Sequence, residues 1–113
     1  MNELKSFLDR MGGLHDAVVR QLVWTPGGKV LRLEIVDLYS NFDGLPEYPG
    51  AVSGAIELQE VEQISFALQT DEQRLTIHDF LVEAEHENVY RAAITFWPSG
   101  RLTASFRKYM LPA

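Results

Sequence analysis

The chain has 113 residues, of which 46% are hydrophobic and 23% charged, and it contains no cysteine. This length predicts a single domain, residues 1–113, with one core, and the missing cysteines exclude disulfides, thiolate catalysis and cysteine-ligated zinc. The formal net charge of −6 argues against a nucleic-acid binder, because such proteins neutralise phosphates with Lys and Arg. No apolar stretch approaches the roughly 18 residues of a spanning helix, and the start lacks a signal-peptide pattern, so we expect a cytoplasmic protein without membrane contact.

The first predicted element is a short helix. Residues 2–11 place Leu4, Phe7, Leu8 and Met11 at helical spacing. Gly12 and Gly13 follow and are expected to end the helix.

The next predicted elements are strands in hairpins. The alternation in residues 30–35 is typical of a strand with one wet face, and a Pro-Gly-Gly turn joins it to the strand before it. A second hairpin is predicted where residues 90–96 and 102–106 flank the sequence WPSGR.

The middle of the chain is less distinct. Residues 55–69 fit two short strands, which we favour, but their apolar residues could also form a helical stripe. Residues 71–74 predict a turn, residues 75–85 a strand, and the sequence HEN a tight connection.

Short connections without a crossover helix predict antiparallel pairing. We therefore expect an α+β fold that is mostly β. One N-terminal helix would pack on a bent antiparallel sheet, or on a partly closed barrel, of six to seven strands.

Charge is unevenly distributed. Residues 43–87 are rich in acids with Arg74 as the only base, whereas residues 88–113 contain Arg and Lys but no acid. The two regions either offset each other as cross-strand pairs, or the acidic region forms a surface that attracts a basic partner.

Two His-Asp pairs, His15-Asp16 and His78-Asp79, raise the question of metal binding or proton relay. Neighbours on a strand point to opposite faces, so His78 and Asp79 could share an ion only at a bulge. We predict instead that His15 and Asp16 form a structural junction. His15 would be a half-buried packing residue, and the Asp16 carboxylate would accept hydrogen bonds from backbone N–H groups.

Weak metal-ligand candidates are Glu83, Glu85 and His86, although we favour a solvent-exposed strand end as their explanation. The sequence contains no Gly-x-Ser-x-Gly elbow and no phosphate-binding glycine loop. We predict no cofactor and no catalytic residues, and the sequence favours a protein that is not an enzyme without deciding the question.

The connection from residue 39 to residue 54 is longer than strand pairing requires. It is either an omega-like loop whose aromatic rings cover an open end of the sheet, or an aromatic and acidic recognition surface. The predicted binding residues in this loop are Tyr39, Phe42, Asp43, Glu47 and Tyr48.

Several segments, LHDAVV, DLYSNFDGLPEYPG, AIELQEVEQISF and LTIHDFLVEA, resemble a group of small bacterial proteins that begin with an L/F-H-D-A-x-V motif. That group is similar to the immunity proteins of polymorphic toxin systems. The resemblance implies a small β-rich cytoplasmic protein that binds and blocks a toxin or another protein, and it brings no catalytic residues.

Three functions therefore stay open. The first is a non-catalytic protein-binding module that uses residues 39–54 to engage a toxin or another basic protein. The second is a small-ligand or metal-binding protein with a cleft beneath that loop, using Asp16, His78, Glu83 or His86. The third is a structural or assembly protein, and the oligomeric state is left undetermined.

Overall fold

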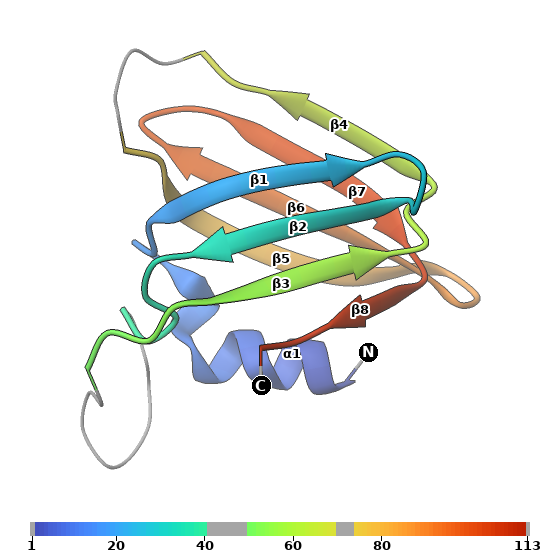
Figure 1. Ribbon diagram of the computed structural model, residues 1–113. Helices are drawn as coiled ribbons and strands as arrows, with labels where there is room; N and C mark the ends of the chain where they lie inside the picture. The colour runs from blue at the N-terminus through green and yellow to red at the C-terminus, as the bar shows by residue number, and fades with distance from the viewer. Residues whose placement is uncertain (1, 41–49, 70–73, 113) are drawn as a thin grey trace.

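The protein is an α+β fold that is mostly β, in a computed structural model that describes residues 2–40, 50–69 and 74–112 (Figure 1). The elements in chain order are α1 (Asn2–Arg10), η1 (Gly12–Leu14), β1 (Val19–Thr25), β2 (Val30–Ile35), β3 (Gly54–Gln59), β4 (Gln63–Ala67), β5 (Thr76–His86), β6 (Val89–Trp97), β7 (Arg101–Phe106) and β8 (Lys108–Met110). Residues 55–69 form strands and not a helix, as favoured from the sequence.

The strands form two antiparallel sheets of four, and this corrects the expectation of one sheet with six to seven strands. One sheet has the order β1-β2-β3-β8, and the other has the order β4-β7-β6-β5. The sheets face each other in Figure 1, with α1 at the lower end of the sandwich. The described strands do not close into a barrel.

The reason for two sheets is a pair of kinks. The chain bends between β3 and β4, where Glu60 has a φ of 50°, and it bends again between β7 and β8 at Arg107. The two bends lie side by side, because the N–H of Glu62 donates to the carbonyl of Ser105 and the N–H of Arg107 donates to that of Gln59. At this shared corner the chain passes between the sheets twice, from β3 to β4 and from β7 to β8.

One continuous core fills the space between the sheets. The buried side chains come from both sheets and from α1, whose Leu4, Phe7, Leu8 and Met11 lie on one face as the helical spacing predicts. Leu14 of η1 is fully buried beside them. Gly12 and Gly13 both adopt positive φ, which explains why the helix stops there.

The two sides of the sandwich differ. On one side, residues 16–19 run beside the start of β5, with an isolated bridge between Val18 and Thr76 and a hydrogen bond from Val19 N–H to the carbonyl of Leu75. Beyond that contact at the start of β1, no pairing joins β1 to the edge strand β4 in the described residues, and Figure 1 shows the two strands diverging. We call the side of the sandwich where β1 and β4 lie the open side. None of the described helices has the length and apolar character needed to cross a membrane.

Candidate functional site

The two His-Asp pairs lie together in the structure. The rings of His15 and His78 meet edge to face with centroids 5.4 Å apart. Nδ1 of His15 lies 2.7 Å from the backbone carbonyl oxygen of His78, so a proton on Nδ1 donates a hydrogen bond to it. The contact joins the turn after η1 to β5. The sequence could not show it, because 63 residues separate the two histidines.

A bulge in β5 explains why the His78 carbonyl needs this partner. The register with β6 shifts between Ile77 and Asp79, which places His78 at the extra position. A residue at a bulge lies outside the regular ladder of backbone hydrogen bonds. The His15 ring supplies a donor to the carbonyl at that position.

Asp16 holds the same junction through its backbone. Its N–H donates to the carbonyl of Ile77 at 2.8 Å, and its φ is 68°. The carboxylate is 76% exposed and lies 3.6 Å from Nε2 of His15. The predicted junction is therefore made by the Asp16 amide, whereas the carboxylate was expected to make it.

The metal candidates do not gather. Among residues 2–40, 50–69 and 74–112, no three His, Asp or Glu side chains are placed to hold an ion. Glu83 lies opposite Arg91 in the β5–β6 ladder, and Glu85 accepts a hydrogen bond from the Ser105 hydroxyl at 2.8 Å. His86 is exposed at the end of β5.

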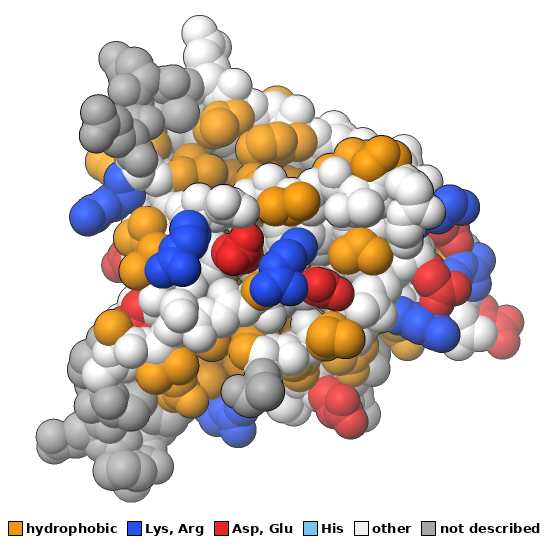
Figure 2. Space-filling model, in the orientation of Figure 1, with side chains coloured by type: hydrophobic (Ala, Val, Ile, Leu, Met, Phe, Trp, Pro, Cys, Tyr) orange, Lys and Arg blue, Asp and Glu red, His pale blue; other side chains and the backbone are white. Residues whose placement is uncertain are grey.

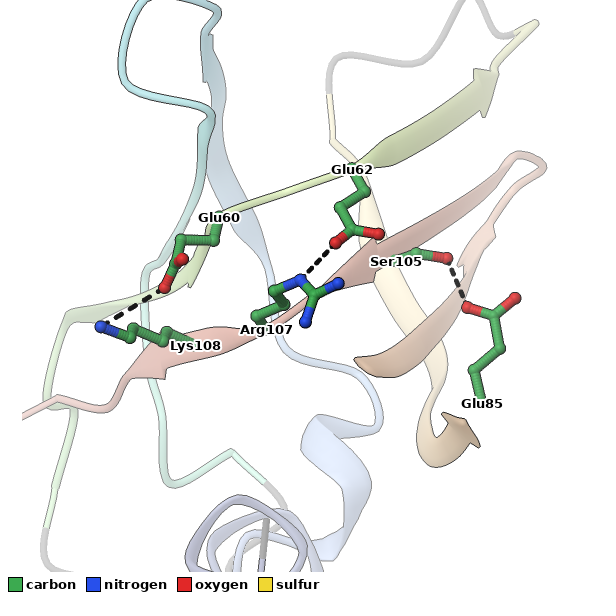
Figure 3. A network of polar contacts seen from close by, with 6 residues as sticks. All are labelled: Glu60, Glu62, Glu85, Ser105, Arg107 and Lys108. Carbon is green, nitrogen blue, oxygen red and sulfur yellow. Dashed lines mark hydrogen bonds and ion pairs between the residues drawn. The ribbon is translucent and has the colours of Figure 1, made fainter. Parts of the chain in front are cut away.

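Acids of the middle region and bases of the C-terminal region meet at the corner where the sheets join (Figure 3). Glu62 pairs with Arg107, and Glu60 pairs with Lys108 at 3.4 Å. This arrangement supports the cross-strand interpretation of the uneven charge. These acids have local partners, and part of the predicted acidic surface is thereby neutralised.

Tyr39 is the predicted binding residue whose position the structure gives. Its ring is half-buried and packs against the core, and its N–H donates to Oδ1 of Asp37 at 3.0 Å. The same carboxylate oxygen accepts from the N–H of Val52, so Asp37 ties the two ends of the 39–54 connection together. The remaining predicted binding residues lie outside the described residues: Phe42, Asp43, Glu47 and Tyr48.

The open side carries a surface that the sequence analysis missed. Trp24 of β1 is paired with buried Leu31, and Phe66 of β4 is paired with buried Leu102. Directly opposed residues share a face of a sheet, so both rings lie on the core-facing side. Trp24 is nevertheless 40% exposed and Phe66 45% exposed, because each is on an edge strand.

Figure 2 shows hydrophobic side chains gathered above β1, on the side toward β4. Phe66 rests edge to face on the buried Phe96, with ring centroids 6.0 Å apart. Leu68 continues the apolar row beyond β4 and is exposed. We call residues 63–69, which include the apolar residues Ile64, Phe66 and Leu68, the β4 edge.

A hollow lies at each end of the β4 edge. One, of about 360 Å³, is lined by Trp24, Pro26, Lys29, Val61 and Ile64 among others. The other, of about 640 Å³, lies between Phe66, Leu68 and the β6–β7 turn. In that turn the Ser99 hydroxyl donates to the carbonyl of Gln69 at 2.6 Å, which holds the end of the edge in place.

A further hollow of about 370 Å³ lies between α1 and β5. Leu8, Phe80 and Leu81 contribute apolar surface to it. Its charged residues carry both signs and are Lys5, Asp9, Glu83 and Arg91.

Comparison with known proteins gives no family for the chain. No protein-family model matches the sequence. No curated protein matches it at a significant level either.

Proposed function

We propose that this chain is a small acidic protein-binding module of the immunity type, which acts by occupying its partner and not by catalysis. The observation that carries the proposal is the exposure of Trp24 and Phe66 on the core-facing side of their sheets. Rings in such positions are normally covered by a further strand or by a second layer. A protein partner would supply that cover.

The composition of the open side supports a protein partner. Exposed aromatic and large apolar side chains are enriched where proteins bind one another. Their backbone belongs to strands, which keeps the ordering cost of binding low. The proposal also includes partner binding by residues 39–54, and Tyr39 links that connection to the core. The net charge of −6 favours encounter with a basic partner such as a toxin.

A second candidate function, binding of a small ligand, is favoured by the hollow between α1 and β5. Its volume of about 370 Å³ lies within the usual range for small-molecule sites, and its charges could orient a zwitterionic compound. A library of amino acids and related zwitterions, screened by melting temperature, tests this candidate.

The protein-binding proposal is tested by affinity purification with matched variants. The test variant replaces Trp24 and Phe66 by Ser, and the control replaces Leu81, which is 65% exposed on β5, by Ser. We expect the unmodified protein and the Leu81→Ser control to retain the same protein, which the double variant loses.

Retention of the same proteins by the double variant would contradict the assigned surface. If the unmodified protein retains no protein partner under several growth conditions, the proposed function fails. Circular dichroism of each variant establishes that a loss of binding is not a loss of fold.

A further inference from the structure

The β4 edge has the properties of a strand that accepts another strand. Residues 63–69, QISFALQ, contain no charged residue and no proline. Edge strands are usually protected by such residues, because an unprotected edge offers unpaired N–H and C=O groups to any extended segment. In contrast, the other edge strand of this sheet, β5, contains Asp79, Glu83 and Glu85.

The two faces of the β4 edge differ in chemistry. On the core-facing side, Ile64, Phe66 and Leu68 alternate along the strand beside the two hollows. An added strand would place every second side chain on this side. Apolar residues are therefore required at those positions of the partner.

On the outer face, small side chains leave Arg101 prominent beside β4. Ser65, Ala67 and Thr103 line a hollow of about 280 Å³ together with Arg91 and Arg101. Arg91 lies opposite Glu83 in the β5–β6 ladder, whereas Arg101 has no carboxylate opposite it and no ion-pair partner within 4 Å in the described part of the chain. Arg101 is paired with Ala67 of β4, so it lies one strand away from the edge. A carboxylate on an added strand would reach across the small residues toward it.

We infer that the β4 edge binds an extended segment of a partner protein that alternates apolar with acidic residues, by adding it as a fifth strand to the β4-β7-β6-β5 sheet. This inference rests on the proposed protein-binding function and specifies its mode, with the acidic residues confined to the bound segment of a partner that is basic as a whole. Backbone hydrogen bonds to β4 provide affinity, and the alternating side chains provide specificity. Pairing between two copies through β4 would bring no carboxylate toward Arg101, because residues 63–69 contain none.

The test uses a synthetic nine-residue peptide in which valine alternates with glutamate. We expect it to slow amide hydrogen exchange in residues 63–69 and to leave β1 unchanged. A second peptide with the same side chains carries N-methyl groups on alternate residues, which removes the hydrogen-bond donors of one edge. A third peptide has lysine in place of glutamate.

The N-methylated and lysine peptides are expected to bind at least tenfold more weakly than the valine–glutamate peptide. Arg101→Gln is expected to weaken binding of the valine–glutamate peptide by about fivefold at most, which is the upper range for an exposed ion pair. Arg10→Gln, which removes the same charge from the end of α1, is the matched control and leaves binding unchanged.

Equal binding of the N-methylated peptide would overturn strand addition, and equal binding of the lysine peptide would overturn the acidic preference. Slower hydrogen exchange at β1 alone would show that the peptide binds β1 and that the binding edge was wrongly assigned to β4. Concentration-dependent dimers that protect residues 63–69 would make a second copy the occupant. If these tests fail while the affinity purification succeeds, the proposed function stands and this mode is wrong. If the purification fails while the peptide binds as expected, the β4 edge stands without the proposed role.

Discussion

At the scale of single residues, the His-Asp pairs are a joint between the N-terminal segment and β5. The Asp16 amide and the His15 ring donate to the carbonyls of consecutive β5 residues, Ile77 and His78. The first pair lies between η1 and β1. The groups that bond there could not be identified from the sequence, because the bulge that leads His78 out of register arises only from pairing with β6.

We expect Asp16 to affect the stability of the fold through its backbone conformation and not through its carboxylate. At a φ of 68° an alanine is strained, whereas glycine is not. We expect Asp16→Ala to lower the free energy of unfolding by about 1 kcal/mol and to lower the melting temperature by a few degrees. Asp16→Gly should keep or raise both values. Equal losses in the two variants would instead assign the stabilisation to the carboxylate.

The His15 hydrogen bond can be separated from the ring contact. His15→Ala removes the donor and should cost about 1 kcal/mol in urea denaturation. His78→Ala removes the other ring but keeps the backbone carbonyl that accepts the bond, so its loss should be clearly smaller. A larger loss for His78→Ala would show that the edge-to-face ring contact stabilises the fold more than the hydrogen bond does.

At the scale of elements, the alternation of apolar residues predicted the strands well, because burial of one face is a local property of each strand. Residues 30–35 and the C-terminal hairpin are examples. The arrangement into two sheets was missed. The kinks near Glu60 and Arg107 have no proline or glycine to mark them, and they arise from backbone contacts between distant residues. The open side was also missed. Trp24 and Phe66 are apolar residues at core-facing positions, and the sequence does not show that their strands lie at the edges of two sheets.

The start of β3 depends on close packing at Gly54. A Cβ there would lie 2.6 Å from Cδ1 of Leu38 and 3.2 Å from Cβ of Pro112. We expect Gly54→Ala to lower the free energy of unfolding by about 1–3 kcal/mol through overpacking. Gly27 is the control: a Cβ there meets no atom within 4 Å, so Gly27→Ala should be neutral or slightly stabilising. Similar effects of both substitutions, measured by thermal denaturation, would contradict this assignment.

At the scale of the whole molecule, the two sheets share one core and are linked by the kinks between β3 and β4 and between β7 and β8, so neither sheet has its own hydrophobic interior. Small domains with a single core usually unfold in one cooperative step. The structure therefore predicts that the sheets lose their structure together, even though they differ in strand order.

The two tryptophans allow a direct test, because Trp24 belongs to one sheet and Trp97 to the other. Trp24→Phe and Trp97→Phe each leave one fluorescent reporter. In urea, we expect each reporter to follow the same transition as circular dichroism measured on the same variant. Two midpoints within either variant would show that one sheet survives the loss of the other.

The two passages of the chain between the sheets also affect how the protein folds during synthesis. β7 and β8 are made after the other strands, yet β7 lies inside one sheet and β8 completes the other. On the ribosome, both sheets therefore wait for residues 101–110, and until then β4 has no neighbour. Long-range pairings of this kind form slowly, and unpaired strands are prone to aggregate. The nascent chain thus exposes QISFALQ for longest, and its protection by a chaperone would matter most before the last strands emerge.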